Sequence, residues 1–542
     1  MLDPIPPQTA ALPVRPAPNA AGKHDRWRWV GIVLLVLFVG ALIGARLLIS
    51  HAEPILRARI IETLSTRFNS RVDLAEFHVS VMNGLQVSGT GLRVFGSFDP
   101  NPSQTGMQPL FAVGSFRFRT TIRSLLRTPM HIETVHLKGL VLNIPPKEER
   151  KQAPQLRPKG GKIQISVGQI VADDAALVIN TMKPGKLPTE FDISNLVLRT
   201  IAPGQPLHFD ATLVNPKPVG DVASSGFFGP FQEDSPRDTA VKGEYSFSNA
   251  DLGTIKGIGG ILSSIGNYNG TLGRIVVDGT TETPDFHLSI SDHPLPLHTE
   301  FHAIVDGTDG DTYLQPVKAK LANSSFVCNG FVIKETQPPG RHIKMDVVVS
   351  KGRIEDFLKL GVKTDPVVMT GNVALKAKLD LPPGEPEIAN RLKLVANFRV
   401  SSAHFTNEKI QEKIDRFSLR SRGKVKEIEA SNPDVRSVLS GAFVLDKGVI
   451  NFSRVQFAMP GTQVNLAGVY SLDGNRFDFH GKARMDAKIS QMIGGWKSIF
   501  LKPVDPFFSK KGAGTEVPIK ISGTKSEPQI GLDFGHKESG AN

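Results

Sequence analysis

The chain has 542 residues, too many for one ordinary compact core, so we expect two to four domains or one elongated sheet. Its 51 Gly and 39 Pro residues predict many turns, while the hydrophobic fraction of 40% excludes a wholly disordered chain. The net charge of +12 comes from scattered basic residues. The one basic cluster, at residues 147–159, also carries two Glu and is typical of a linker, which argues against nucleic-acid binding. The single cysteine, Cys328, can form no intramolecular disulfide and cannot build a zinc site alone.

Residues 29–45 form an uncharged run that predicts a membrane-spanning helix, roughly 25 Å long. The run is long for a signal peptide, and no clear cleavage site follows it, so we expect an uncleaved anchor. Basic residues flank the run on both sides and favour a cytoplasmic N-terminus only slightly. The residues expected to form the anchor are Trp29, Val30, Ile32, Leu34, Leu35, Leu37, Phe38, Leu42 and Ile43.

After the anchor, residues 52–68 place apolar side chains at helical spacing, with charged residues between them. This pattern predicts an amphipathic helix close to the bilayer. From Val72 onward the period changes to two. Segments such as "GLQVSGTGLRVFG", "GNVALKAKLDL" and "QVNLAGVYSLDGNRFDFHGKARM" predict strands bounded by turn residues.

Few helical segments separate these strands, which favours an antiparallel meander over parallel βαβ units. Glycines recur at strand centres and ends and favour bending, so we expect an elongated, curled antiparallel sheet, shaped as a groove, with a few short amphipathic helices. Three segments, 249–266, 407–422 and 487–502, predict short helices, and residues 145–161 and 203–236 predict loops. The helix around Trp496 either caps the open end of the sheet or contacts a membrane or partner.

Motifs of known chemistry are lacking: the sequence contains neither Gly-x-Ser-x-Gly nor a phosphate-binding Lys-Ser/Thr loop. His298, Glu300 and His302 fall on one face of an expected strand and are the best candidate metal ligands, but we favour a solvated strand face over a metal site. Cys328 lies in an alternating strand and is expected to pack as a small side chain. We therefore expect no enzymatic activity, no catalytic residues, no metal and no cofactor.

Two segments, "DGTTETPDFHLSI" from Asp278 and "SGTKSEPQIGLDF" from Ser522, share a Gly-Thr, a proline and a following alternation of apolar residues. Glycine permits a bend, and proline is tolerated where a strand begins because no ladder donor is lost there. We expect the two segments to form the same structural joint, a bend after which the chain begins a new strand.

The order of these features resembles the AsmA-like proteins of double-membraned bacteria. The anchor is followed by "RFNSRVDLAEFHVSVMNGLQVSGTGLRVF" and "IETVHLKGLVLNIPP", which resemble the N-terminal region of that family. The segment "LSGAFVLDKGVINFSRVQFAMPGTQVNLAGVYSLDGNRFDFHGKARMDAKIS" and the closing "ISGTKSEPQIGLDF" resemble its C-terminal region. The resemblance implies a relationship to TamB and to the chorein-type bridge-like lipid transporters, whose β-sheets form a hydrophobic groove.

The regions expected on this basis are a disordered cytoplasmic tail (1–25), the anchor (26–50), an AsmA-like N-terminal region (51–160), a central β-rich region (161–430), an AsmA-like C-terminal region (431–535) and a tail (536–542). The resemblance implies a single-pass protein of the bacterial inner membrane whose bulk lies in the periplasm. The role that the resemblance implies is in outer-membrane biogenesis, by binding or conducting phospholipid acyl chains in a β-groove. The alternative is a scaffold or regulator that assists outer-membrane protein targeting and assembly without lipid transport.

Alternation beside glycine selects the candidate groove residues, although the sequence does not fix which face of each strand looks inward. They are Leu140, Leu142, Ile144, Phe443, Leu445, Val464 and Leu466. The implied partners are inner-membrane lipids, phospholipid, and outer-membrane or periplasmic proteins, with no nucleic acid.

Overall fold

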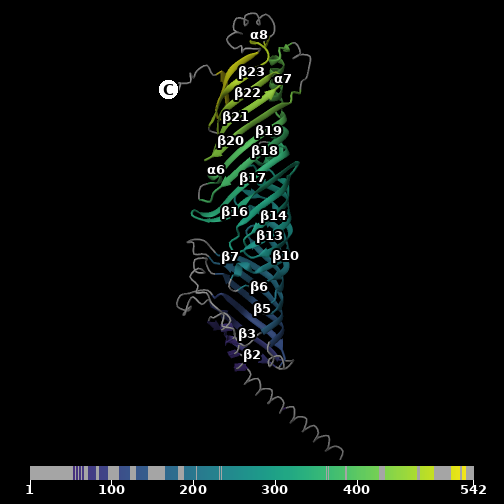
Figure 1. Ribbon diagram of the computed structural model, residues 1–542, viewed down its shortest axis with the longest axis vertical. Coiled ribbons are helices and arrows are strands. Elements are labelled where there is room, and N and C mark those ends of the chain that lie inside the picture. The colour runs from purple at the N-terminus through teal and green to yellow at the C-terminus, as the bar shows by residue number, and fades with distance from the viewer. Residues whose placement is uncertain are drawn as a thin grey trace, which may run out of the picture.

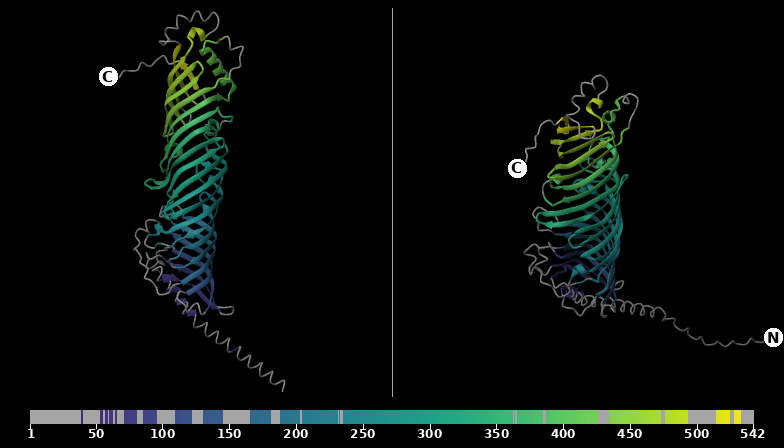
Figure 2. Two further views of the ribbon diagram at one scale, coloured as in Figure 1. Left: turned by 45° about the vertical axis from the view of Figure 1, so that its right-hand side comes forward. Right: turned by 45° about the horizontal axis from the view of Figure 1, so that its top comes forward.

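The protein is mainly β, and its strands form one long open sheet with few helices (Figure 1). This computed structural model describes residues 71–80, 85–95, 109–121, 130–144, 165–180, 514–524 and 528–532, most of 188–492, part of 53–65, and Val39. The strands run obliquely to the long axis of the molecule, with the first strands at one end and the last at the other (Figure 2). The expectation of an elongated antiparallel sheet with few helices is confirmed.

The strands of the first half are β1 (Val72–Asp73), β2 (Glu76–Ser80), β3 (Leu85–Val94), β4 (Phe111–Thr120), β5 (Met130–Ile144), β6 (Ile165–Ile179), β7 (Thr189–Ile201), β8 (Leu207–Pro216), β9 (Val219–Phe228), β10 (Ala240–Asp251), β11 (Ile258–Gly259) and β12 (Ile261–Thr271). Those of the second half are β13 (Arg274–Leu288), β14 (Leu295–Val305), β15 (Thr312–Leu321), β16 (Ser324–Thr336), β17 (Pro339–Arg353), β18 (Met369–Leu381), β19 (Lys393–Phe405), β20 (Ser437–Asp446), β21 (Val449–Met459), β22 (Thr462–Ser471), β23 (Phe477–Met485), β24 (Thr515–Gly523) and β25 (Pro528–Leu532). The helices are α5 (Ile354–Gly361), α6 (Ile388–Arg391), α7 (Glu408–Ser421) and α8 (Ile489–Met492), with short 3-10 turns at Pro236–Asp238 (η1) and Leu252–Thr254 (η2).

Nearly every strand pairs with the strands that precede and follow it along the chain, in antiparallel register. One pair departs from the expected meander, because β5 and β6 are parallel, with Met130 opposite Ile165 and Ile144 opposite Ile179. A parallel pair needs a crossover of a dozen or more residues, and the segment 145–164 between the two strands is long enough to supply it. The ladder of hydrogen bonds continues through β5–β6 and through β19–β20.

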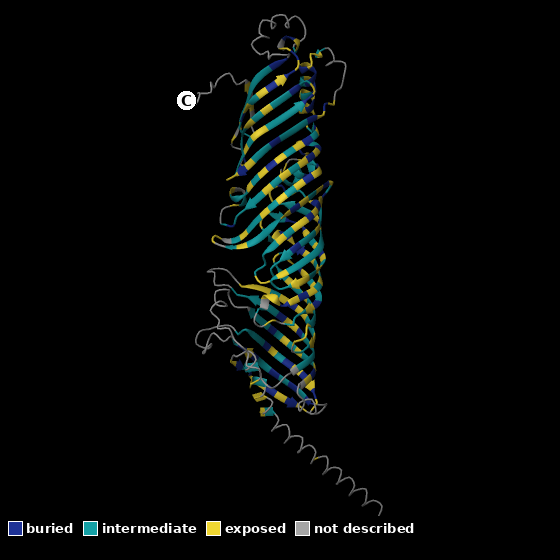
Figure 3. Cartoon of the chain, in the orientation of Figure 1, coloured by how far each residue is buried: buried dark blue, intermediate teal, exposed yellow. Residues whose placement is uncertain are grey.

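Buried and exposed residues alternate along the strands, so the sheet has two different faces (Figure 3). We call one of them the apolar face and define it by a row of register partners. The row is Thr281, Thr299, Ala319, Phe326, Val349, Leu375, Phe398, Gly441, Val455, Leu466, Gly481 and Ile519. The other face, with residues such as Glu300, Lys318 and Lys376, is called the polar face.

Helices cover the apolar face at two places and produce two packed cores. At the N-terminal end, Ile60, Ile61 and Leu64 from the helical residues of 53–65 pack on a buried cluster of β1 to β7. This contact agrees with the amphipathic helix predicted there. Further along, α5 packs Ile354, Phe357 and Leu358 against a second cluster that includes Val349 and Val400.

The helices α5, α7 and α8 follow β17, β19 and β23. These three strands run in the same direction, so the three helices begin on the same side of the sheet, where the strands end. Asp356 of α5 accepts hydrogen bonds from the Asn323 backbone N–H (3.0 Å) and from the Ser324 hydroxyl (2.7 Å), which ties α5 to the β15–β16 turn. The predicted helix at 407–422 is confirmed as α7, and Asn407 caps it by accepting from the N–H of Ile410.

The expected helix over 249–266 is wrong. This segment contains the end of β10, the turn η2, and the strands β11 and β12. Gly257, Gly259 and Gly260 disfavour a helix by about 1 kcal/mol each, while β9, β10 and β13 offer strand partners. Cross-strand pairing therefore overrides the helical spacing of the apolar residues.

The expected loop over 203–236 is also wrong, because it contains β8 and β9. These strands pair from Leu207 opposite Phe228 to Pro216 opposite Val219. Pro218 lies in the turn between β8 and β9, where a missing backbone donor costs no ladder bond, and Pro216 is the last residue of β8.

The two similar segments that contain Pro284 and Pro528 do not share one structure. Pro528 begins β25 after a break from β24, as predicted, whereas Pro284 lies inside β13. There the register with β14 shifts between Thr283 and Phe286, so a bulge in one strand replaces the expected joint.

Several expectations fall outside the described residues: the anchor residues 29–38 and 42–43, the segment 145–161, and Trp496 with residues 493–502. In the part of the chain that the structure describes, none of the helices has the length and apolar character needed to cross a membrane.

Candidate functional site

The apolar face extends along the whole sheet and is its most extensive chemical feature. Toward the N-terminus the row defined above continues through Ser264, Phe247, Val222, Leu213 and Ile193. At about 4.8 Å between neighbouring strands, the ladder from β3 to β25 measures roughly 100 Å across the strands. Helices cover this face at the two packed cores, and the apolar surface left between and beyond them indicates an interaction site.

An apolar pocket of about 440 Å³ lies on this face between the two packed cores. Its lining consists of Val277, Leu297, Thr299, Phe301, Ala303, Val305, Thr312, Leu314, Val317, Ala319, Phe326, Cys328 and Met345. Apart from the hydroxyls of its two threonines, the side chains that line it are apolar or, for Cys328, only weakly polar. Cys328 is buried, as predicted, and burial raises the pKa of its thiol.

A row of aromatic rings continues the apolar face beyond the pocket. Phe398, Phe443, Phe452 and Phe479 come from four strands, and their successive ring centroids lie 6.2, 5.5 and 5.5 Å apart. Such tilted pairs are favourable contacts in addition to the area they bury. The row carries the apolar surface from β19 to β23.

The predicted groove residues fall into two groups. Leu140 and Leu142 are register partners of Val113 and Phe111 and belong to the N-terminal core, which the helical residues of 53–65 cover. The C-terminal candidates lie beyond the pocket: Phe443, Leu445, Val464 and Leu466 pair with Ala396, Leu394, Phe457 and Val455. Leu445 is buried, and the other three are half-buried. The last residue of β5, Ile144, pairs with Ile179, and its side chain lies outside the described residues.

Hydroxyl groups interrupt the apolar face between β9 and β14. We call this group the hydroxyl belt and define it as Ser224, Tyr245, Ser264, Tyr268, Thr281 and Thr299. The Tyr268 hydroxyl lies 2.8 Å from Ser224 Oγ, the Tyr245 hydroxyl lies 3.0 Å from Ser264 Oγ, and the two threonine hydroxyls are 2.7 Å apart. Burial raises the pKa of Tyr245 and of Tyr268, so both phenols keep their protons.

Glycines make room for the tyrosine rings of the belt. A Cβ atom at Gly266 would lie 2.8 Å from Cε1 of Tyr245, and one at Gly243 would lie 2.6 Å from the Tyr268 hydroxyl oxygen. Each ring therefore lies against the backbone of a neighbouring strand.

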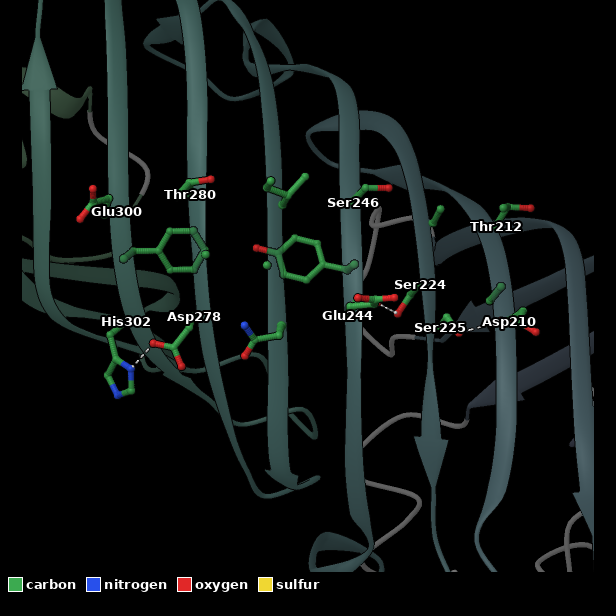
Figure 4. Close-up of a pocket in the computed structure, with 18 of the residues that line it drawn as sticks. Asp210, Thr212, Ser224, Ser225, Glu244, Ser246, Asp278, Thr280, Glu300 and His302 are labelled. Atoms are coloured by element: carbon green, nitrogen blue, oxygen red, sulfur yellow. Dashed lines mark hydrogen bonds and ion pairs between the residues drawn. The ribbon is translucent and has the colours of Figure 1, made fainter.

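A larger hollow, of about 1040 Å³, lies on the polar face across β7 to β15 (Figure 4). Figure 4 shows His302 directed at Asp278 and Ser225 directed at Asp210, each on a neighbouring strand. Hydrogen bonds from Ser225 and Arg199 lower the pKa of Asp210. Most charges of this hollow are thus already paired across strands, so we regard the smaller apolar pocket as the candidate site.

The three candidate metal ligands do share the polar face of β14, as predicted. Each is paired with a different neighbour: His298 with Glu282 at 2.6 Å, His302 with Asp278 at 2.7 Å, and Glu300 with Lys318 at 3.3 Å. Nowhere among the described residues do three His, Cys, Asp or Glu side chains converge as metal ligands. In this arrangement the two histidines hydrogen-bond carboxylates of the neighbouring strand, and Glu300 forms an ion pair with Lys318, all on the polar face of the sheet.

Sequence reasoning missed the pocket residues Leu314, Phe326 and Met345, although their strands alternate as clearly as those that were selected. It also missed the hydroxyl belt. The only signal of the hydroxyl belt in the sequence is that Ser, Thr and Tyr replace aliphatic residues at the strand positions that lie on the apolar face.

No protein-family model matches the chain, and a search of curated proteins finds no significant match.

Proposed function

We propose that the chain is an AsmA-like protein of the bacterial inner membrane that binds phospholipid acyl chains along the apolar face. The anchor at residues 26–50 holds it in the membrane, and the sheet projects into the periplasm. The apolar face is then the surface of a groove along which acyl chains are shielded from water.

The observation that carries this proposal is the apolar face itself, with its uncovered pocket. The structure describes no second sheet that packs on this face, and helices pack on it at the two cores. One leaflet of a bilayer is about 15 Å deep, so the apolar face is several times longer than one acyl chain. Several chains can lie on it, or one chain can move along it.

The energetics suit weakly selective binding. Each methylene removed from water contributes about 0.8 kcal/mol, so ten methylenes offset the several kcal/mol that association costs. Affinity then depends mainly on the buried chain length and little on the headgroup.

Cys328 provides a direct test, because it is the only cysteine and lines the apolar pocket. We expect phospholipid added to the full chain in lipid-free amphipol to slow alkylation of Cys328 by a small maleimide. The matched control carries Cys328→Ala with Val327→Cys, which moves the thiol to the exposed neighbouring residue on the polar face. Lipid should leave the alkylation rate of the control unchanged.

Equal alkylation of Cys328 with and without lipid, together with lipid-free protein in native mass spectrometry, would refute lipid binding at the pocket. The alternative function, a scaffold for outer-membrane proteins, has one supporting feature. Within the described residues β25 pairs only with β24, so its other edge is available for strand addition. Photo-crosslinking from Gln529 of β25 would then give protein adducts in cells, whereas crosslinking from Leu314 in the pocket would give none.

A further inference from the structure

The hydroxyl belt has a defined hydrogen-bond direction, which follows from its serines. Ser224 Oγ donates to the backbone carbonyl of Glu244 at 2.9 Å, and Ser264 Oγ donates to that of Thr280 at 2.9 Å. A serine hydroxyl has one hydrogen. Each serine therefore accepts from the tyrosine beside it when all the donors of the group are used.

The tyrosine hydroxyls consequently act as donors to Ser224 and Ser264. Their single hydrogens are used, while lone pairs on both phenol oxygens remain unoccupied by these bonds. At the position of the two tyrosines, the apolar face therefore offers hydrogen-bond acceptors. An ester carbonyl or an ether oxygen has no hydrogen to donate and gains nothing from them.

The threonine pair adds one donor beside these acceptors. Thr281 is the register partner of Ser264, and its hydroxyl bonds that of Thr299. Whichever threonine accepts in that bond keeps its own hydrogen free. A group that both donates and accepts matches this arrangement, and a hydroxyl is the smallest such group.

The belt adjoins the apolar pocket, since Thr299 lines the pocket and Val277 of the pocket is the register partner of Tyr268. An acyl chain in the pocket that extends toward β12 and β10 meets the belt partway along its length. Plain methylenes at this position desolvate the phenol oxygens without replacing their lost contacts with water, whereas a chain hydroxyl bonds to them.

We propose that the hydroxyl belt is a selectivity site that favours lipids with a hydroxyl on the acyl chain over lipids with plain chains. This inference rests on the proposed function, because it requires acyl chains to occupy the apolar face. The site discriminates by one or two hydrogen bonds, so the expected preference is about 3- to 10-fold.

The test compares stearate with 12-hydroxystearate, using protection of Cys328 from maleimide on the full chain in lipid-free amphipol. We expect the wild type to bind 12-hydroxystearate about 3- to 10-fold more tightly. The double variant Tyr245→Phe with Tyr268→Phe keeps both rings against their glycines and removes the acceptors. It should bind both acids equally and bind stearate no more weakly than the wild type does.

The matched control is Tyr313→Phe, because Tyr313 lies on the polar face, opposite Ile304 of β14. It should retain the wild-type preference. Equal binding of the two acids by the wild type, or a preference that survives in the double variant, would overturn the selectivity site and leave the proposed function intact. Failure of both acids to protect Cys328 would overturn both.

Discussion

Enlarging a side chain at the apolar pocket distinguishes empty space from a packed core. Val277 lines the pocket of about 440 Å³ and is only partly buried. The change Val277→Phe directs a ring over Ala303, its register partner, in the way that other rings of this face cover glycines. We expect the free energy of unfolding to stay equal or to rise by up to about 1 kcal/mol, because the added ring atoms leave water without a clash.

The matched control is Val87→Phe, because Val87 is only 1% exposed in the N-terminal core. Overpacking there should lower the free energy of unfolding by about 1–3 kcal/mol. Urea unfolding followed by circular dichroism measures both changes. A loss at Val277→Phe as large as that at Val87→Phe would mean that the pocket is tightly packed, and the reasoning would fail.

The same change should weaken lipid binding. A phenylalanine ring in the pocket displaces about three methylenes of a bound chain, worth about 2 kcal/mol, or roughly 30-fold in affinity. Competition against a fluorescent fatty acid measures this difference, and Val87→Phe provides the control with unchanged affinity. A stable Val277→Phe protein with wild-type affinity would show that acyl chains bind elsewhere.

Further predictions concern the stability of the sheet. Gly441→Val should lower the free energy of unfolding by about 1–3 kcal/mol, because the new Cβ would lie 2.7 Å from a backbone oxygen. At Gly361 a Cβ would meet nothing within 4 Å, so Gly361→Ala should be neutral or stabilising. Urea titrations compare the two variants. His342 bonds Asp380 at 2.7 Å and Glu335 at 2.6 Å, and these bonds, that to Asp380 first, raise its pKa. Its stabilising contribution is therefore complete below the unfolded pKa of about 6.5 and is lost as the pH rises through the folded pKa. The stability difference between wild type and His342→Gln should shrink from pH 6 to pH 9 in unfolding curves, and a constant difference would contradict this.

Period-two alternation predicted the sheet because a strand with one buried face must place apolar residues at every second position. The helix α7 was predictable for a related reason, since apolar spacings of three and four place its residues on one helical face. The segment 249–266 combined such spacing with many glycines, and its outcome depended on the partner strands β9 and β13. No local pattern in the segment reports the availability of those partners.

The site was predictable only in part for a similar reason. Alternation beside glycine selected Leu140 and Phe443 without fixing which strand face looks inward, and their register partners in the structure are Val113 and Ala396. Whether each is covered depends on helices that are distant in the sequence: residues 53–65 cover the region of Leu140, and α5 covers the region of Val349. The pocket lies between the two covered regions, so its position follows from tertiary packing.

The pairing of aromatic residues with glycines explains how a single-layer sheet can keep one apolar face open. Rings of this face lie over glycines of neighbouring strands in the pairs Phe116 with Gly89, Tyr268 with Gly243, Tyr245 with Gly266, Phe301 with Gly279, Phe398 with Gly441 and Phe479 with Gly468. Each ring buries one of its own faces against backbone, which supplies apolar burial without a second sheet layer. Phe116 and Phe479 are buried, whereas the other four rings are half-buried and keep part of their surface available to a ligand. Stability and the proposed lipid binding therefore depend on the same residues, and a larger side chain at one of these glycines should impair both.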